Sequence, residues 1–165
     1  STNLSNNTQV DYQPAWSPDG SKIIFASNRV INRGKLWVMN ADGSNLTELT
    51  RNDNRTNIEP VWTPNGDLLL YTQFDSRGGG VPKLLGNYWR DGGPQAGVSE
   101  FRISEESLGM REPDVSPDGL WIVFSANADN DQLDIYIMRI NGAEMIPRVV
   151  NENGNNFDPA WRPQP

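Results

Sequence analysis

The sequence has neither cysteine nor histidine among its 165 residues. The missing cysteine excludes a disulfide framework, a thiolate zinc site and a cysteine nucleophile. The missing histidine excludes a Ser-His-Asp triad, a histidine-ligated metal and a histidine general base. Chemistry performed by this chain itself would have to use other side chains, chiefly carboxylates, so the composition favours a binding surface over a catalytic site.

Basic residues and long apolar runs are also scarce. The 14 basic and 21 acidic residues give a net charge of −7, which argues against nucleic-acid and anionic-membrane partners, because Lys and Arg hold both. Strongly apolar runs are about four residues long, whereas a membrane-spanning helix needs about 20. We therefore expect no direct membrane insertion. Residues 1–4 show no signal peptide, so we expect a mature or trimmed chain.

One sequence pattern occurs four times. It is present as QPAWSPDG at 13–20, EPVWTPNG at 59–66, EPDVSPDG at 112–119 and DPAWRPQP at 158–165. An ungapped offset of 99 residues superposes the first unit on the third, pairing Pro14 with Pro113 and Phe25 with Phe124. This regularity indicates a repeat architecture and has to be interpreted before single elements are predicted.

Each unit predicts four short strands. In the first unit they cover the residues around 14–16, then 22–27, 35–40 and 46–50. Ser17-Pro18-Asp19-Gly20 predicts a tight turn after the first strand, because proline presets φ and Ser and Asp cap backbone groups. Four antiparallel strands in about 46 residues are typical of a β-propeller blade. The predicted fold class is therefore all-β, with about three blades.

The string PAWSPDGSKIIFASNR…LWVMNADGSNLTELT resembles the WD-like, Pro-Asp-type repeat of TolB-like propellers. Related blades occur in the propeller domains of the prolyl oligopeptidase family and of tricorn-type proteases. The resemblance covers nearly the whole chain, except that residues 76–94 form an irregular stretch in unit two. It implies one propeller domain over 1–165, with blades at about 12–50, 58–104 and 111–150, and a further first strand at 157–165.

Three blades do not close a ring, and TolB-like propellers have six, so we expect the chain to be part of a six-bladed propeller. Residues 3–5 resemble the tail of a preceding blade. Two copies could complete the ring as a homodimer, although the strand at 157–162 would then be redundant. The alternative, which we favour, is that a longer polypeptide or other subunits cover the open ends.

The strongest candidate site is formed by the residue that precedes the first proline of each unit. First strands line the central channel of a propeller, so these residues should form a ring at one channel mouth, where they would attract a cation or a basic partner segment. The competing interpretation is that they cap nearby backbone amides. The residues are Gln13, Glu59, Glu112 and Asp158.

Two further groups of residues are candidate sites. Asp129, Asp131 and Asp134 have calcium-like spacing, but their loop lacks the glycine and distal glutamate of an EF-hand, so we favour a solvated hairpin loop and predict no metal or other cofactor. Tyr88, Trp89 and Arg90 are residue types enriched in binding hot spots and suggest a partner-binding loop. Alternatively, Trp89 replaces Trp37 in the third strand of its unit.

The function expected from these observations is that of a non-catalytic propeller that serves as a protein-binding or assembly module. The resemblance also implies a periplasmic or extracellular location, and TolB-like propellers bind a partner protein at the channel mouth. The alternatives are a propeller segment of a larger hydrolase of the prolyl oligopeptidase type, and a channel that binds an ion or a small ligand. A glycosidase-like pair of carboxylates, Glu59 and Glu112, is less favoured because no aromatic cluster accompanies it.

Overall fold

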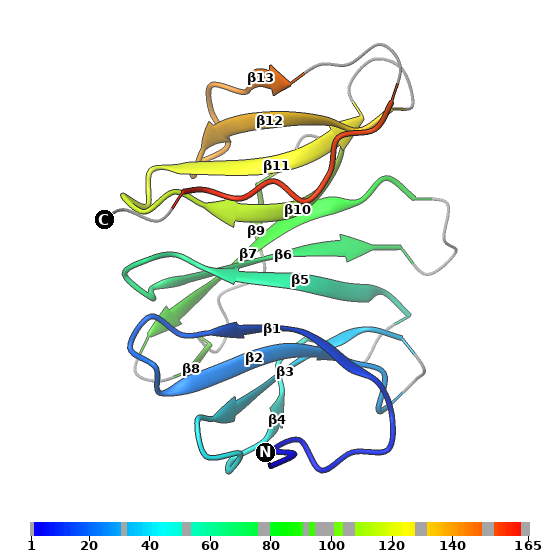
Figure 1. Ribbon diagram of the computed structural model, residues 1–165, viewed down its shortest axis with the longest axis vertical. Coiled ribbons are helices and arrows are strands. Elements are labelled where there is room, and N and C mark those ends of the chain that lie inside the picture. Colours follow the sequence, from blue (N-terminus) through cyan, green and yellow to red (C-terminus); the bar gives the residue numbers. More distant parts are fainter. Residues whose placement is uncertain are drawn as a thin grey trace.

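The computed structural model describes residues 2–30, 33–50, 54–75, 80–90, 93–94, 101–103, 108–127, 132–149 and 154–162. Antiparallel strands and turns make up these ranges, and none of them forms a helix long and apolar enough to cross a membrane. The strands form three sheets that lie one after another in chain order (Figure 1). The prediction of an all-β fold built from propeller blades is confirmed.

Each sheet is one blade, and its strands pair in chain order, except that β9 of blade two pairs with β7. Blade one contains β1 (Asp11–Trp16), β2 (Lys22–Ser27), β3 (Lys35–Asn40) and β4 (Thr47–Glu48). Blade two contains β5 (Thr56–Trp62), β6 (Leu68–Phe74), β7 (Lys83–Arg90), β8 (Gly93–Pro94) and β9 (Phe101–Arg102). Blade three contains β10 (Gly109–Val115), β11 (Trp121–Asn127), β12 (Asp134–Arg139) and β13 (Ile146–Val149).

Blade two differs from the expectation of an irregular stretch at 76–94. Lys83–Arg90 form a regular strand, β7, that is longer than the third strands of the other two blades. Leu84, Leu85 and Trp89 are buried in it, so inter-blade packing holds the segment extended in spite of the glycines that precede and follow it. Residues 76–79, 91–92 and 95–100 lie outside the described ranges.

The turn between the first two strands is built alike in all three blades. In blade one the Ser17 hydroxyl donates to Asp19 Oδ1 at 2.6 Å and accepts the Lys22 amide at 2.9 Å. The hydrogen bonds from Ser17 and Ser21 hold the pKa of the exposed Asp19 carboxyl at about 2. These bonds explain why Ser or Thr begins each of the three turns, at Ser17, Thr63 and Ser116.

Two hydrophobic cores lie between blades. Between blades one and two, Ile24 and Val38 pack against Trp62, Leu85 and other residues of blade two. The Trp62 and Trp89 rings meet edge to face, with centroids 4.9 Å apart. Trp62 therefore packs between blades one and two.

Between blades two and three, the core is built mainly from aliphatic residues and methionines. Leu70 of blade two packs here with Val115, Phe124 and Met138 of blade three. Val115 is therefore the residue that takes the place of Trp62 in this core, as the repeat predicts.

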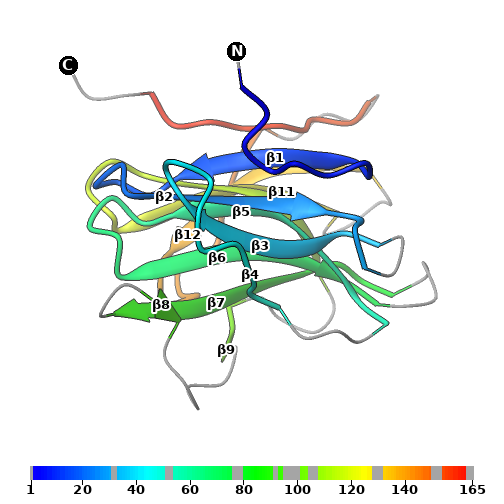
Figure 2. The same cartoon turned by 90° about the horizontal axis from the view of Figure 1, so that it is seen from below.

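The N-terminal segment lies over the outer face of blade one, as Figure 2 shows. A Cβ on Gly43 would lie 3.0 Å from the carbonyl oxygen of Leu4, and one on Gly142 would lie 2.9 Å from that of Ile103. Ile103 follows β9 at the end of blade two, and the offset of 99 residues superposes Leu4 and Gly43 on Ile103 and Gly142. Leu4 therefore takes the position of a preceding blade's tail, as the sequence predicts.

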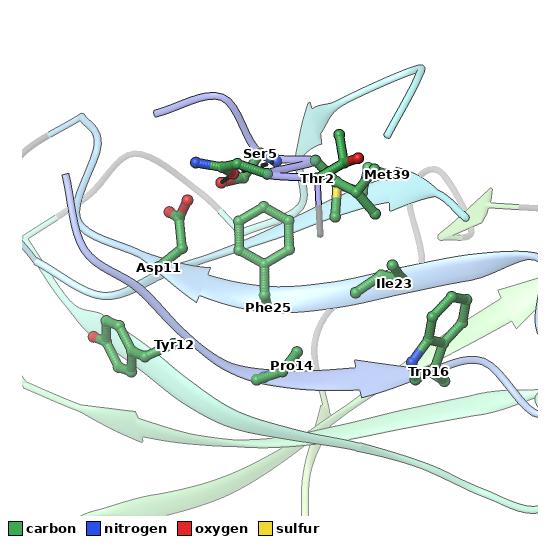
Figure 3. A pocket seen from close by; sticks show the side chains of 11 residues that line it. Thr2, Ser5, Asp11, Tyr12, Pro14, Trp16, Ile23, Phe25 and Met39 are labelled. Atoms are coloured by element: carbon green, nitrogen blue, oxygen red, sulfur yellow. Dashed lines mark hydrogen bonds between the residues drawn. The ribbon is translucent and has the colours of Figure 1, made fainter. Parts of the chain in front are cut away.

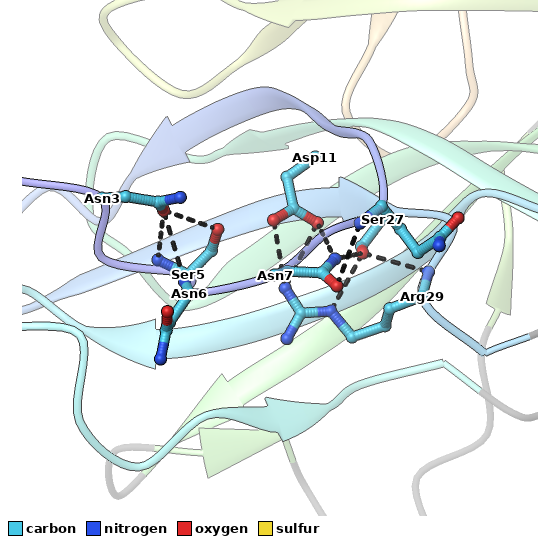
Figure 4. A network of polar contacts seen from close by, with 8 residues as sticks. Asn3, Ser5, Asn6, Asn7, Asp11, Ser27 and Arg29 are labelled. Carbon is cyan, nitrogen blue, oxygen red and sulfur yellow. Dashed lines mark hydrogen bonds and ion pairs between the residues drawn. The ribbon is translucent and has the colours of Figure 1, made fainter.

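Polar and apolar contacts hold the N-terminal segment on blade one. The segment roofs a hollow of about 320 Å³ whose floor includes Ile23, Phe25 and Met39 (Figure 3). Asn7 Nδ2 donates to Asp11 Oδ1 at 3.2 Å and to the Ser27 hydroxyl at 3.5 Å, and Arg29 Nη2 binds both oxygens of the same Asp11 carboxylate at 3.2 Å (Figure 4). The apolar face of blade one that looks away from blade two is therefore partly covered.

Candidate functional site

The four predicted ring residues lie in equivalent positions, beside one another on successive first strands. Gln13, Glu59 and Glu112 each occupy a β-bulge, where the register to the second strand shifts by one residue. All four have left-handed backbone conformations, with φ of 51° at Gln13, 57° at Glu59, 56° at Glu112 and 53° at Asp158. Residues with long side chains seldom adopt this conformation, so each bulge must be held by other contacts.

Those contacts are hydrogen bonds that run from blade to blade. Gln13 Oε1 accepts the Glu59 amide at 3.1 Å, and Glu59 Oε2 accepts the Glu112 amide at 2.8 Å. Glu112 Oε2 accepts the Asp158 amide at 2.9 Å and the Ser125 hydroxyl at 2.6 Å. Each ring residue therefore accepts a hydrogen bond from the next one, which supports the amide-capping interpretation for Gln13, Glu59 and Glu112.

Three of these residues also border a hollow on the axial side. It measures about 200 Å³ and is lined by Glu59, Pro60, Glu112, Pro113, Asp158 and Pro159. Burial raises the pKa of the Glu59 carboxyl above its ordinary value, and the Glu112 carboxylate acts in the same direction. Within the described ranges, no cluster of three or more acidic side chains is arranged to hold a metal ion.

The C-terminal segment 154–162 lies along β10, where the first strand of a further blade would lie (Figure 1). Asp114 holds it: its Oδ2 accepts the Trp161 amide at 2.8 Å, and its carbonyl oxygen accepts Trp161 Nε1 at 3.2 Å. Asp114 is not among the site residues predicted from the sequence, although the repeat contains a signal at this position. The repeat has Ala15 and Val61 at the equivalent positions, so a carboxylate is a departure from the pattern.

The residues of the predicted partner-binding loop lie instead at the end of β7. Trp89 is buried against Trp62 and is not available to a partner, whereas Tyr88 and Arg90 are exposed. Trp89 does not take the place of Trp37 either. Trp37 pairs with Phe25 of its second strand, and the residue in that place in blade two is Leu85, which pairs with Tyr71.

The predicted calcium ligands are described only in part, because Asp129 and Asp131 lie outside the described residues. Asp134 begins β12 and is buried. Its Oδ1 accepts a hydrogen bond from Asn156 Nδ2 at 3.3 Å. Asp134 thus helps to hold the C-terminal segment against blade three.

Taken together, the three consecutive antiparallel blades around one axial side define an arc of a β-propeller. No protein-family model matches the chain. The solved structure of a putative TolB from Agrobacterium tumefaciens superposes with a TM-score of 0.70 at 24% identity, over 87% of this chain and 50% of that one. Within the propeller class, the chain has the TolB-like fold.

Two curated proteins are similar in sequence. The "Uncharacterized peptidase YuxL" of Bacillus subtilis is 31% identical over 157 residues, which covers 76% of this chain and 24% of that protein. A TolB homologue of Chlorobium luteolum is 27% identical over 149 residues, which covers 87% of this chain and 30% of that protein. The chain thus spans between about a quarter and a third of the length of these relatives.

Proposed function

We propose that this chain is a non-catalytic part of a TolB-like propeller that binds a basic segment of a partner protein at the axial hollow. The observation that carries the proposal is the hollow of about 200 Å³, in which Glu59, Glu112 and Asp158 alternate with prolines. Three acidic side chains with no basic residue among the lining favour an ammonium or guanidinium group. The similarity to TolB supports this choice over catalysis, and it supports an extracytoplasmic location.

The absence of histidine and cysteine from the whole sequence supports the same choice. The Ser125 hydroxyl beside the acidic ring donates to Glu112 and is buried, which favours a structural donor over a poised nucleophile. Glu59 and Glu112 are likewise occupied by backbone amides. Their engagement in inter-blade hydrogen bonds favours a structural and electrostatic role for both carboxylates over acid–base catalysis.

The test is a calorimetric titration of the chain with a lysine-rich peptide. A separate calorimetric titration uses Ca²⁺. In the double variant Glu112→Gln, Asp158→Asn, the affinity for the peptide should fall by about tenfold or more. The amide oxygens of this variant keep the inter-blade hydrogen bonds possible, as Gln13 does naturally. Glu144→Gln removes one exposed charge elsewhere and is the control. Unchanged peptide affinity, or stronger binding of Ca²⁺ than of the peptide, would contradict the proposal.

A second candidate is a propeller segment that admits or positions peptides for a linked hydrolase. The similarity to the peptidase YuxL, at 31% identity, favours it. In that case the chain would contribute a substrate-facing surface, and the nucleophile would lie in another domain. Peptidase activity of the full-length gene product on chromogenic peptides, together with a Gly-X-Ser-X-Gly segment in the gene, would support this candidate.

A further inference from the structure

A second hollow, separate from the axial one, lies between blades one and two. It is on the side of the molecule where the first turns of all three blades lie (Figure 1), and it measures about 180 Å³. The Trp62 and Trp89 indoles form part of its wall, and each is more than nine-tenths buried. The polar residues that line it are Ser17, Asp19, Ser21, Lys22 and Asn65. Blade one therefore supplies the charged groups, and blade two supplies the aromatic wall.

The two indoles are specific to this interface. The position of Trp89 is identified in every blade by one backbone hydrogen bond, from the amide of Ala41 to the carbonyl oxygen of Ser21 at 2.9 Å, from Trp89 to Asp67 at 2.8 Å, and from Ile140 to Leu120 at 3.0 Å. Between blades two and three, Val115 takes the place of Trp62, and Ile140 takes that of Trp89. An aromatic wall is thus present at only one of the two described interfaces.

The lysine of this hollow is also a departure from the repeat. The Ser17 amide donates to the carbonyl oxygen of Lys22 at 2.9 Å, and the Thr63 amide donates to that of Leu68 at the same distance. Leu68 therefore takes the place of Lys22 in blade two, where it is buried in the core between blades two and three. An ammonium group in a place that an apolar residue fills in the next blade indicates a role beyond holding the fold.

The charges of the lining favour an uncharged ligand. Hydrogen bonds from Ser17 and Ser21 hold the pKa of Asp19 at about 2, so its carboxylate is ionised at neutral pH. Lys22 supplies the opposite charge, and these two residues are the charged members of the lining. With one charge of each sign beside it, neither an anion nor a cation gains a net attraction.

The hydrogen-bonding capacity left in the hollow consists mainly of donors. Among the described residues, Lys22 Nζ donates to one acceptor and keeps further N–H groups, and Asn65 engages its Oδ1 while its Nδ2 donates to none. Both oxygens of Asp19 already accept hydrogen bonds, from Ser17 and Ser21. Because a hydroxyl oxygen has two lone pairs for its one proton, a ligand with several hydroxyl groups matches this excess of donors.

The aromatic wall and the volume narrow the choice among such ligands. A pyranose ring has a face made of C–H groups, which can pack against indole carbons while its hydroxyl groups reach polar side chains. Pockets for drug-sized ligands start at about 300 Å³, so this smaller hollow fits one sugar ring and not a chain of them.

We propose that the hollow between blades one and two binds a single uncharged hexopyranose unit. Lys22 and Asn65 donate to its hydroxyl oxygens, and the two indoles contact its C–H face. This site shares no residue with the axial hollow, and it does not depend on the function proposed there.

The test is an NMR titration of the chain with methyl β-D-glucopyranoside and, separately, with methyl β-D-galactopyranoside. At least one glycoside should bind with a dissociation constant on the order of 1 mM, as expected of a ligand of this size. The shifts should be confined to the amides of residues 17–22 and 62–66 and to the indole N–H groups of Trp62 and Trp89. The absence of local shifts with both glycosides at about tenfold higher concentration would overturn the proposal.

Charged sugars test the argument from the lining charges. Glucuronate and glucosamine have the same ring with a negative or a positive charge, and both should bind no more tightly than the glucoside. Tighter binding of either one would show an ion site and would overturn the assignment to an uncharged sugar.

Two substitutions remove donors and place in the hollow a residue that the repeat already has at the equivalent position. Lys22→Leu copies Leu68, and Asn65→Asp copies Asp19. Each should weaken glycoside binding by about threefold to tenfold. Lys83→Leu removes a lysine from β7, away from the hollow, and is the matched control. Native amide dispersion shows that each variant is folded, and folded variants that bind as tightly as the control would overturn the proposal.

Discussion

The two inter-blade interfaces use different materials at equivalent positions. Between blades one and two, the core contains the Trp62–Trp89 pair, and the side chain of the neutral, exposed Gln13 accepts the axial hydrogen bond. Between blades two and three, the core is largely aliphatic, and the more buried carboxylate of Glu59 accepts the axial hydrogen bond. The fold therefore determines where a contact between blades occurs, whereas the chemistry of each contact varies from blade to blade.

The largest effect should come from the aromatic core. Trp62→Ala removes a buried indole and should lower the free energy of unfolding by about 3–5 kcal/mol, the usual cost of a large-to-small core substitution. Trp16 occupies the equivalent position in blade one but is 57% exposed, so Trp16→Ala should cost much less. Urea denaturation of both variants tests this contrast. Equal losses would mean that the repeat position, and not burial, determines the effect.

The axial hydrogen bonds should come next. Glu59→Ala leaves the Glu112 amide without its acceptor and should cost about 1–3 kcal/mol, whereas Gln13→Ala, at an exposed bond, should cost less than about 1 kcal/mol. Glu59→Gly should be less harmful than Glu59→Ala, because glycine adopts the φ of 57° without strain. Denaturation midpoints measure all three. A Glu59→Ala protein as stable as the Gln13→Ala protein would argue against the proposed difference between the two bonds.

A smaller effect should appear as a pH dependence at Glu59. Because burial raises its pKa in the folded state, the folded chain holds this proton to a higher pH than the unfolded chain does. The free energy of unfolding should therefore fall as pH rises from the ordinary value of 4.5 through the raised pKa. Glu59→Gln should remove this slope and still accept the Glu112 amide. Glu144→Gln is the control for loss of one charge, and a slope that persists in Glu59→Gln would refute the assignment.

The smallest effect is expected in the surface turns. The lowered pKa of Asp19 means that its contribution to stability is present above its unfolded value of 3.8 and is lost as pH falls through about 2. Asp19→Asn should flatten this acid limb by lowering the stability at neutral pH slightly, because an amide oxygen still accepts the hydrogen bonds but more weakly than a carboxylate, and blade two already has Asn65 in this place. Thermal unfolding at pH values between 3.8 and about 2 measures this loss of stability. An unaltered acid limb would show that other carboxylates dominate there.

The sequence predicted the blades well because the repeat is carried by residues with local physical roles. Proline, serine and aspartate specify the Ser17–Gly20 turn, and Trp62 has to be apolar where blades meet. The sequence also brought the four ring residues together correctly. Capping of backbone amides was one of the two interpretations of these residues. Which amides Glu59 and Glu112 accept could not be predicted, because it depends on a left-handed bulge that no residue type specifies.

Trp89 shows a second limit. Unit two is longer than unit one, so the sequence alone does not show how their third strands align. The sequence therefore suggested Trp37 as the counterpart of Trp89. Strand pairing places Leu85 there instead and puts Trp89 against Trp62. Only the three-dimensional register relates Trp89 to Ala41 and Ile140, since those three residue types share nothing that a pattern could detect.

The contact of Leu4 with Gly43, repeated by Ile103 with Gly142, has a consequence for the order of folding. In each case a residue from an earlier part of the chain lies over a turn of the blade that follows. During synthesis the covering residue therefore emerges from the ribosome before the turn that it covers. We expect the blades to fold in the direction of translation, each against the blade that precedes it. Pulse-labelled hydrogen exchange on stalled nascent chains would reveal this order of folding.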